Sequence, residues 1–272
     1  MKPEKRADPE TITRAITASK KYRDVSPETV RRIATDCALK YGRKEAEKRA
    51  RAILHQSWGA YFDSRIDYIR ILSRLSDDIQ EGKDPKECVR PALEAAPSAR
   101  ERFPVLDRFY REIFALTGAP ASVVEHACGL NPLTLFWAPL PEEFEWRAYD
   151  IDLKLVGFLN SAASLLGLDG RLKAATGDAL SGSYGYADMV LMLKLLPVLE
   201  RQRRGAALEA MRKAECRHLV ASFPVKSLSG RAKGMPENYA RLFESWVANE
   251  PWKHERILFE TELVFVVRKG DR

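Results

Sequence analysis

An apolar run that breaks into a turn of small residues lies near the middle of the chain, at residues 122–133 (Ser-Val-Val-Glu-His-Ala-Cys-Gly-Leu-Asn-Pro-Leu). Apolar runs that end in Gly and Asn-Pro are typical of buried strands followed by turns. In an open α/β sheet, the junction between a strand and its loop presents free backbone N–H groups to ligands. The segment therefore indicates either a first strand that delivers a ligand-binding loop or an ordinary buried strand and turn, because one glycine is a weak signal.

Strand-like and helix-like segments alternate after this run and just before it. A helical face at residues 105–114 precedes it, and helical stretches at 153–166 and 201–214 separate later apolar runs. Those runs, which we interpret as strands, cover residues 145–151, 187–193, 218–224 and 263–267. Strands joined by helical crossovers form a largely parallel sheet, so the pattern predicts an α/β fold.

The first hundred residues have a helical pattern instead. Ser26-Pro27-Glu28 supplies a capping serine, a proline at the first helical position and an acid in the first turn. We expect a small bundle with helices near residues 26–37, 44–57 and 64–76. Gly82 and three prolines then interrupt residues 77–97. The sequence thus predicts a helical domain over residues 1–100 and an α/β domain over residues 101–272.

Basic residues are concentrated at the N-terminus. Residues 1–55 contain 15 Lys and Arg against 8 Asp and Glu, so this segment alone accounts for the net charge of +7. The density suits contacts with nucleic-acid phosphates, although a solvated helical surface is the alternative. The residues that we expect to contact RNA here are Lys20, Lys21, Arg23, Arg31 and Arg32.

Composition excludes several classes of protein. The 272 residues contain no apolar run of 18, and the first ten are charged and polar, so we expect neither a membrane span nor a secretory signal, and a cytoplasmic location. The four cysteines are widely spaced and the four histidines supply no zinc-like spacing beside them. We therefore expect reduced thiols and no metal.

Charged residues follow the predicted strands, at the sheet edge where ligands bind in doubly wound folds. Asp150 comes about 20 residues after Gly129, where an acid commonly accepts hydrogen bonds from ribose hydroxyls. Asp178 follows another expected strand and can accept from an adenine amino group. Each acid alone is more often a cap or a loop residue, but the ordered set favours an adenosine ligand.

Cations follow the strands expected at residues 187–193 and 218–224. Lys194 emerges from an apolar run, so it either reaches solvent or faces the cleft, which we favour. Lys226, Arg231 and Lys233 lie on a glycine-containing loop that can wrap a nucleic-acid backbone or be a solvated loop.

These segments together resemble the bacterial 16S rRNA (guanine(1405)-N7)-methyltransferases, the aminoglycoside-resistance family that uses S-adenosylmethionine. The resemblance spans nearly the whole chain. It is carried by Ala18–Arg23, Thr29–Ile33, Ala127–Leu133, Lys194–Pro197 with Leu199-Glu200, Ser222–Pro224, Lys233–Met235, Asn238-Tyr239 and Thr261–Leu263. The Cys-Gly-Leu-Asn-Pro loop and the Lys-Gly-Met segment are specific to this group.

The resemblance implies a Rossmann-like class I methyltransferase sheet behind an N-terminal helical bundle that binds rRNA. It also implies a set of cofactor-binding residues: Arg102 on the methionine carboxylate, Ala127 and Gly129 beside the methionine moiety, Asp150 on the ribose, Ile151 against the adenine, Asp178 and Ala179 at the adenine edge, and in addition Glu125 and Lys194. Glu125-His126 stands where the family usually has Asp-Ile. His126 on a strand can equally be a core histidine with its hydrogen bonds satisfied.

The implied reaction explains why no catalytic constellation is visible. Guanine N7 carries a lone pair and no proton, so no general base is required, and alignment of the reacting atoms supplies the rate. We expect a monomer that acts on 16S rRNA in the 30S subunit without a protein partner or a membrane. The alternatives are methylation of a different rRNA base, or a non-catalytic RNA-binding protein with a degenerate methyltransferase fold.

Overall fold

The computed structural model describes residues 7–59, 66–225 and 235–270, and its centre is a seven-stranded sheet of order β3-β2-β1-β4-β5-β7-β6. The strands are β1 (Ser122–His126), β2 (Glu145–Asp150), β3 (Leu172–Thr176), β4 (Ala187–Leu193), β5 (Cys216–Pro224), β6 (Lys253–Leu258) and β7 (Glu262–Arg268). Strands β1 to β5 run parallel, while β7 lies antiparallel to both β5 and β6. The predicted α/β fold with a largely parallel sheet is confirmed.

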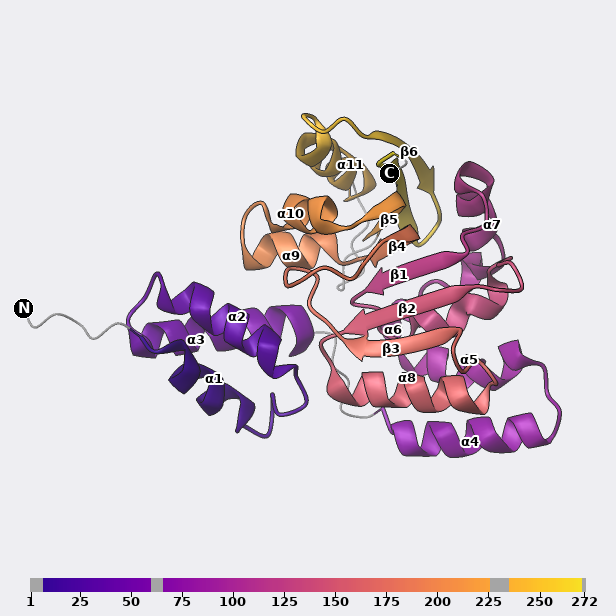
Figure 1. Ribbon diagram of the computed structural model, residues 1–272, viewed down its shortest axis with the longest axis horizontal. Coiled ribbons are helices and arrows are strands. Elements are labelled where there is room, and N and C mark those ends of the chain that lie inside the picture. The colour runs from indigo at the N-terminus through magenta and orange to yellow at the C-terminus, as the bar shows by residue number, and fades with distance from the viewer. Residues whose placement is uncertain (1–6, 60–65, 226–234, 271–272) are drawn as a thin grey trace, which may run out of the picture.

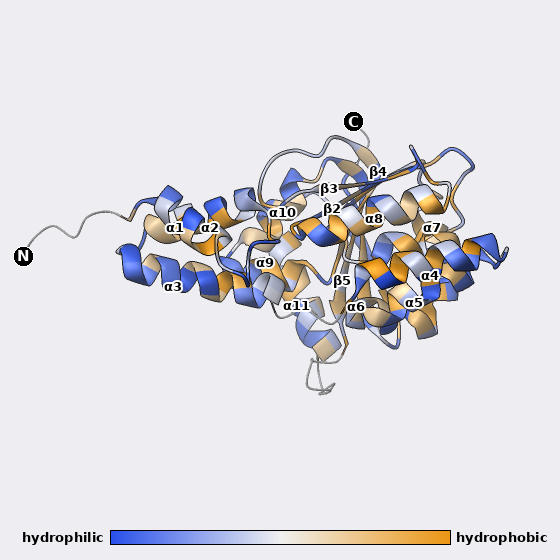
Figure 2. Ribbon diagram, turned by 90° about the horizontal axis from the view of Figure 1, so that it is seen from below, coloured by the Kyte–Doolittle hydropathy of each residue, from blue (hydrophilic) through white to orange (hydrophobic). Residues whose placement is uncertain are grey.

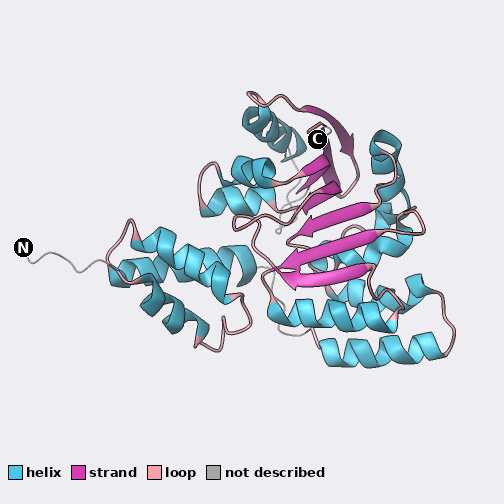
Figure 3. Cartoon of the chain, viewed as in Figure 1, coloured by secondary structure: helices cyan, strands magenta, loops and turns pink. Residues whose placement is uncertain are grey.

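Both faces of the sheet are covered by helices, which explains why the central strands are continuous apolar runs. In β4, Met189 and Leu191 belong to one hydrophobic cluster, and Val190 and Met192 belong to the other. Successive side chains of a strand point to opposite faces, so one strand feeds two cores. The result is a three-layer arrangement of helices, sheet and helices (Figure 3).

Side-chain caps mark the beginning of several helices. Ser26 and Asp152 cap α2 and α8 with side-chain oxygens that accept backbone N–H groups. The helices are α1 (Pro9–Thr17), α2 (Pro27–Ala38), α3 (Arg43–Leu54), α4 (Tyr68–Gln80), α5 (Pro85–Ala95), α6 (Pro97–Arg100), α7 (Leu106–Thr117), α8 (Leu153–Leu165), α9 (Leu196–Gln202), α10 (Ala206–Lys213) and α11 (Met235–Val247).

Helices α1, α2 and α3 form an N-terminal module, defined here as residues 7–59, with its own hydrophobic core. Ile12, Ile16, Val30, Ile33 and Leu54 are buried in that core. Apolar residues at helical spacing direct these side chains inward. The outward positions of α3 are charged, and Figure 2 shows this helix blue over most of its length.

The division between the two cores differs from the predicted boundary at residue 100. Leu75 of α4 and Val89 and Leu93 of α5 share one cluster with Trp146 of β2 and Phe158 of α8. Residues 68–100 therefore pack as part of the α/β body, and the N-terminal module is shorter than predicted. Local periodicity identifies helices but not the surface on which they pack.

The N-terminal module lies at the carboxyl ends of β1, β2 and β3, toward which the arrowheads point in Figure 1. Val25 pairs with Asp152 in an isolated antiparallel bridge, and Ser26 N–H donates to the carbonyl of Ile151 at 2.8 Å. Asp24 accepts from Leu153 N–H and pairs with Lys154.

Within the described ranges, no helix is long and apolar enough to cross a membrane.

Candidate functional site

A cavity of about 810 Å³ lies where the carboxyl ends of β1 to β4 meet the N-terminal module. The loops that follow these strands supply part of its lining, and the N-terminal module, residues 96–101 and α9 supply much of the rest. The residues singled out from the sequence that line it are Arg32, Ala127, Gly129, Asp150, Ile151, Asp178, Ala179 and Lys194. Parallel strands bring their following loops to one edge, and this explains why residues far apart in sequence meet here.

The loop after β1 is held in a conformation that exposes its backbone. Ala127 and Gly129 have φ of 50° and 53°, in the left-handed region that costs a non-glycine residue about 1–2 kcal/mol. Gly129 N–H donates to Asp150 Oδ2 at 3.0 Å. A Cβ built on Gly129 meets no atom within 4 Å, so the backbone borders open space. A ligand can approach this loop closely.

Asp150 and Asp178 are both buried and both hydrogen-bonded. Asp150 also accepts from Asp152 N–H at 3.0 Å, and burial raises the pKa of Asp150 to about 6 against these backbone hydrogen bonds. Asp178 Oδ1 accepts from Leu180 N–H at 3.0 Å. Each carboxylate has about four acceptor positions, so both can accept further donors.

Lys194 is the second non-glycine residue with a left-handed backbone, at φ 57°. Its N–H donates to the carbonyl of Ser222 at 3.0 Å, which ties the end of β4 to β5. Its Nζ lies 2.6 Å from Glu101 Oε2 and 3.6 Å from Glu262 Oε1, and the side chain is 15% exposed. Lys194 therefore brings a positive charge, held by two carboxylates, to the cavity wall.

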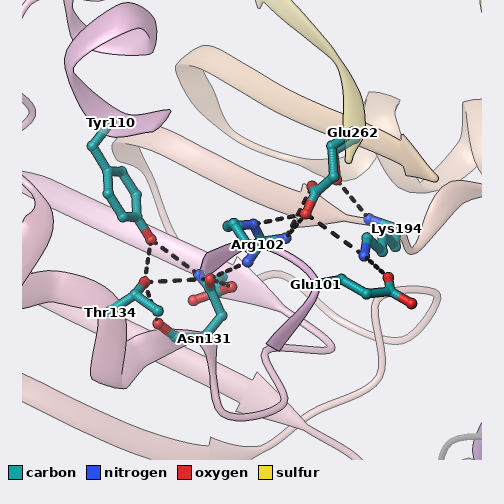
Figure 4. Close-up of polar contacts among 9 residues, drawn as sticks. Glu101, Arg102, Tyr110, Asn131, Thr134, Lys194 and Glu262 are labelled. Atoms are coloured by element: carbon teal, nitrogen blue, oxygen red, sulfur yellow. Dashed lines mark hydrogen bonds and ion pairs between the residues drawn. The ribbon is translucent and has the colours of Figure 1, made fainter. Parts of the chain in front are cut away.

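Arg102 forms a buried ion pair behind this wall (Figure 4). Its Nε and Nη2 donate to the two carboxylate oxygens of Glu262 at 2.8 and 2.9 Å, and a further N–H donates to Asn131. Burial raises the pKa of Glu262, but Arg102 and Lys194 outweigh it and hold this pKa below its ordinary value. Arg102 is not among the residues that line the cavity. Its contact with a cofactor carboxylate stays a prediction.

Glu125 is buried among uncharged donors and is not among the residues that line the cavity, so its contact with the cofactor stays a prediction. Its two oxygens accept from Asn131 Nδ2 at 2.8 Å and from Trp146 Nε1 at 3.1 Å. Burial raises the pKa of Glu125 to about 8. Asn131 also donates to Tyr110, whose hydroxyl contacts Thr134, so Glu125 anchors a hydrogen-bonded network beneath the loop.

His126 is buried beside the rings of Tyr149 and Tyr184, with 6.1 and 4.7 Å between the ring centroids. Burial lowers the pKa of His126 to about 4. Its Nδ1 has no hydrogen-bond partner among the described residues. It is thus a core histidine, but its hydrogen-bonding capacity is not fully satisfied.

The residues expected to contact RNA divide into three groups. Lys20, Lys21, Arg23 and Arg31 are exposed on the N-terminal module. Arg32 instead turns toward the cavity, where it pairs with Asp178 at 2.8 Å. Lys226, Arg231 and Lys233 lie outside the described residues.

Sequence reasoning missed several residues that the structure brings together. Trp58 donates to Asp152 Oδ2 at 3.0 Å, and both residues line the cavity. Glu262 lies in a segment that carried the family resemblance, and that resemblance was the available signal for a role of Glu262.

No group of three or more potential metal ligands occurs in the part of the chain that the structure describes.

The chain matches the family model described as ribosomal RNA methyltransferase (FmrO) over residues 18–266. It is 38% identical to 16S rRNA (guanine(1405)-N(7))-methyltransferases of Micromonospora echinospora, with 98% of each chain covered, and of Micromonospora rosea, with 95% and 96% covered. The crystal structure of 16S rRNA methyltransferase RmtF in complex with S-adenosyl-L-homocysteine is similar, with a TM-score of 0.80 and 34% identity over 98% of this chain and 100% of that one. The Rossmann-like methyltransferase fold and the resemblance predicted from the sequence are confirmed, and the chain belongs to the FmrO family of ribosomal RNA methyltransferases.

Proposed function

We propose that this protein transfers a methyl group from S-adenosylmethionine to N7 of guanine 1405 of 16S rRNA, in the 30S subunit, and thereby confers aminoglycoside resistance. The observation that carries the proposal is the cavity, which lies between methyltransferase strand ends and a basic helical module. Membership of the FmrO family and the relatives' assigned target support it.

The residues at the cavity fit the cofactor. The open space beside Gly129 accommodates an amino-acid moiety close to the backbone, and Lys194 offers a cation. Asp150 and Asp178, at the ends of β2 and β3, offer acceptors for ribose hydroxyls and for an exocyclic amino group. Ile151 and Ala179 add apolar surface for the base. The S-adenosyl-L-homocysteine held by RmtF belongs to the same chemical class.

The reaction needs orientation rather than proton transfer. When bound, S-adenosylmethionine supplies an electrophilic methyl group on a positively charged sulfur. Guanine N7 has no proton to remove, so the chain's residues have to hold the nucleophile in line and exclude water. The cavity-lining loop at Ala127 and Gly129 and the side chain of Lys194 suit that task, and no described residue has to act as a base.

The substrate form follows from the charge distribution. Lys20, Lys21, Arg23 and Arg31 lie on the N-terminal module, where they can contact phosphates without reading sequence. Recognition of folded RNA depends on its shape, and the assembled subunit fixes the tertiary shape of the rRNA. We therefore propose the 30S subunit as the substrate. We also propose that the enzyme is a monomer, that it acts without a protein partner, and that it acts in the cytoplasm.

Cofactor affinity is expected to fall at low pH. Burial raises the pKa of Asp150 to about 6, so the acceptor form predominates at pH 7 and the protonated form at pH 5. Ribose hydroxyls donate to the ionised form, so the Kd for S-adenosylhomocysteine is expected to rise about tenfold from pH 7 to pH 5. Calorimetric titration across this range measures it. The Asp150→Asn variant is expected to bind weakly at both pH values, and an equally steep pH dependence in that variant would refute the assignment.

Resistance tests the proposed function in cells. Expression of the protein in a susceptible bacterium is expected to raise tolerance to kanamycin and gentamicin. The matched control is the Asp150→Ala variant at the same level of folded protein, which is expected to give no protection. Unchanged tolerance with soluble, folded wild-type protein would contradict the proposal.

A further inference from the structure

Two adjacent arginines of α2 occupy different environments. Successive residues of a helix point about 100° apart, so Arg31 and Arg32 cannot serve the same surface. The Arg31 side chain is 53% exposed and pairs with Glu10 at 2.8 Å, within the N-terminal module. The Arg32 side chain is 18% exposed and lines the cavity.

Arg32 binds residues of the α/β body that also line the cavity. Its Nε donates to Asp178 Oδ2 at 2.9 Å, and its Nη2 lies 2.8 Å from the same oxygen. Nη2 also donates to Gln202 Oε1 at 3.1 Å, at the end of α9. The guanidinium thus connects the N-terminal module to two elements of the methyltransferase fold.

These contacts leave one side of the Asp178 carboxylate open. Both Arg32 contacts are made to Oδ2, while Oδ1 accepts from Leu180 N–H. A carboxylate has about four acceptor positions, so one remains for a further donor. Asp178 is 7% exposed, and a buried carboxylate is costly without a compensating charge. Arg32 supplies that charge and fixes the carboxylate's orientation.

We propose that Arg32 is a positioning residue for the cofactor's base: it holds Asp178 as the acceptor for the exocyclic amino group of adenine. The inference rests on the proposed function, in which Asp178 faces the adenine edge. It reassigns Arg32, which the sequence placed among the RNA contacts. It also makes the N-terminal module a part of the cofactor site.

Other contacts fix the module near the same end of the cavity. Trp58 donates to Asp152, and Ser26 N–H donates to the carbonyl of Ile151, the residue expected against the adenine. The module is therefore held on the loop after β2 while Arg32 reaches the loop after β3. Because coupling between two binding events is reciprocal, cofactor binding should in turn stabilise docking of the module.

The test compares two ligands that differ only at the adenine edge. S-inosylhomocysteine carries an oxo group where S-adenosylhomocysteine carries the amino group, so it places an acceptor against Asp178. A site built around a hydrogen bond rejects a ligand that lacks the matching group. Calorimetry on wild-type protein is therefore expected to show a strong preference for the adenosyl ligand.

Arg32→Ala is expected to raise the Kd for S-adenosylhomocysteine about tenfold or more, while the Kd for S-inosylhomocysteine changes little. The ratio of the two dissociation constants should therefore fall toward one. A general loosening of the fold would leave this ratio unchanged. Arg31→Ala is the matched control and is expected to keep both constants. Arg32→Lys retains the charge without the planar fork, so it should restore part of the ratio.

The outcomes separate this inference from the proposed function. If wild-type protein binds S-adenosylhomocysteine and Arg32→Ala keeps the wild-type ratio, the role of Arg32 is overturned and the proposed function stands. If wild-type protein binds neither ligand, the proposed function falls, and the inference falls with it. If Arg32→Ala fails to fold, the same comparison is made between Arg32→Lys and Arg31→Ala. Wild-type affinity for S-adenosylhomocysteine in Arg32→Lys, together with an unchanged ratio of the two dissociation constants, would overturn the inference.

Discussion

Replacement of Arg102 by alanine is expected to lower the free energy of unfolding by about 3–5 kcal/mol. Arg102 is 3% exposed and Glu262 is fully buried, with two hydrogen bonds between them at 2.8 and 2.9 Å. Removal of the guanidinium leaves a buried carboxylate with Lys194, at 3.6 Å, as the remaining cation beside it. Since domains are stable by only about 5–15 kcal/mol, this is a large fraction of the total. Urea unfolding followed by circular dichroism measures the change.

Two further variants show whether the buried charge is the cause. Arg49→Ala removes a surface ion pair, in which both side chains are about half exposed, and is expected to cost no more than about 1 kcal/mol. Arg102→Met combined with Glu262→Leu removes both charges and is expected to recover most of the stability lost by Arg102→Ala. A loss in Arg102→Ala as small as that in Arg49→Ala would show that the pair contributes little.

Charge reversal on the N-terminal module is expected to abolish binding to the 30S subunit. Lys20, Lys21, Arg23 and Arg31 are exposed, and their replacement by Glu turns attraction to phosphates into repulsion. Loss of several phosphate contacts should weaken binding by more than about 100-fold near physiological salt. Arg32 is left intact because it faces the cavity. Filter binding to 30S subunits and calorimetry with S-adenosylhomocysteine measure the two affinities.

The control reverses charges on β6, an edge strand of the sheet. Lys253 and Arg256 are exposed on β6, the strand farthest from β3 in the sheet order. Their replacement by Glu is expected to leave 30S binding much less affected. Equal loss of 30S and cofactor binding in the N-terminal variant would show a folding defect instead, and would remove the evidence for a docking surface.

Apolar runs in the sequence were sufficient to predict the strands that are buried on both faces. Residues 189–193 and 263–267 are continuous apolar runs because the side chains of each run pack into two hydrophobic clusters. Strand β6 (Lys253–Leu258) escaped prediction because it is an edge strand whose residues are largely exposed, and its sequence is polar. An edge strand has one neighbouring strand and needs no apolar run, so the sequence carries no signal by which β6 could be predicted.

Domain division could not be predicted from local sequence. The prolines at residues 85, 91 and 97 suggested a boundary, but they begin or interrupt short helices that share a hydrophobic cluster with the sheet. Whether an amphipathic helix covers the sheet or joins a bundle depends on contacts between distant segments. The sequence contains no periodic signal for that choice.

At the site, the positions of the acids could be predicted and their partners could not. Asp150 and Asp178 follow strands, and the geometry of a parallel sheet brings strand ends together. The partners of Arg32 and Arg102 lie 146 and 160 residues away along the chain. An arginine in a basic segment gives no indication that its guanidinium is turned inward, so Arg32 was grouped with its exposed neighbours.

Methyl transfer to purified 30S subunits tests the proposed function most directly. Labelled S-adenosylmethionine is incubated with the protein and 30S subunits, and in parallel with protein-free 16S rRNA, followed by chemical cleavage at N7-methylguanine. We predict label on the 30S subunit at guanine 1405 and cleavage at that single position. Label at a different nucleotide, or no label on either substrate from protein that binds S-adenosylhomocysteine, would contradict the proposed function.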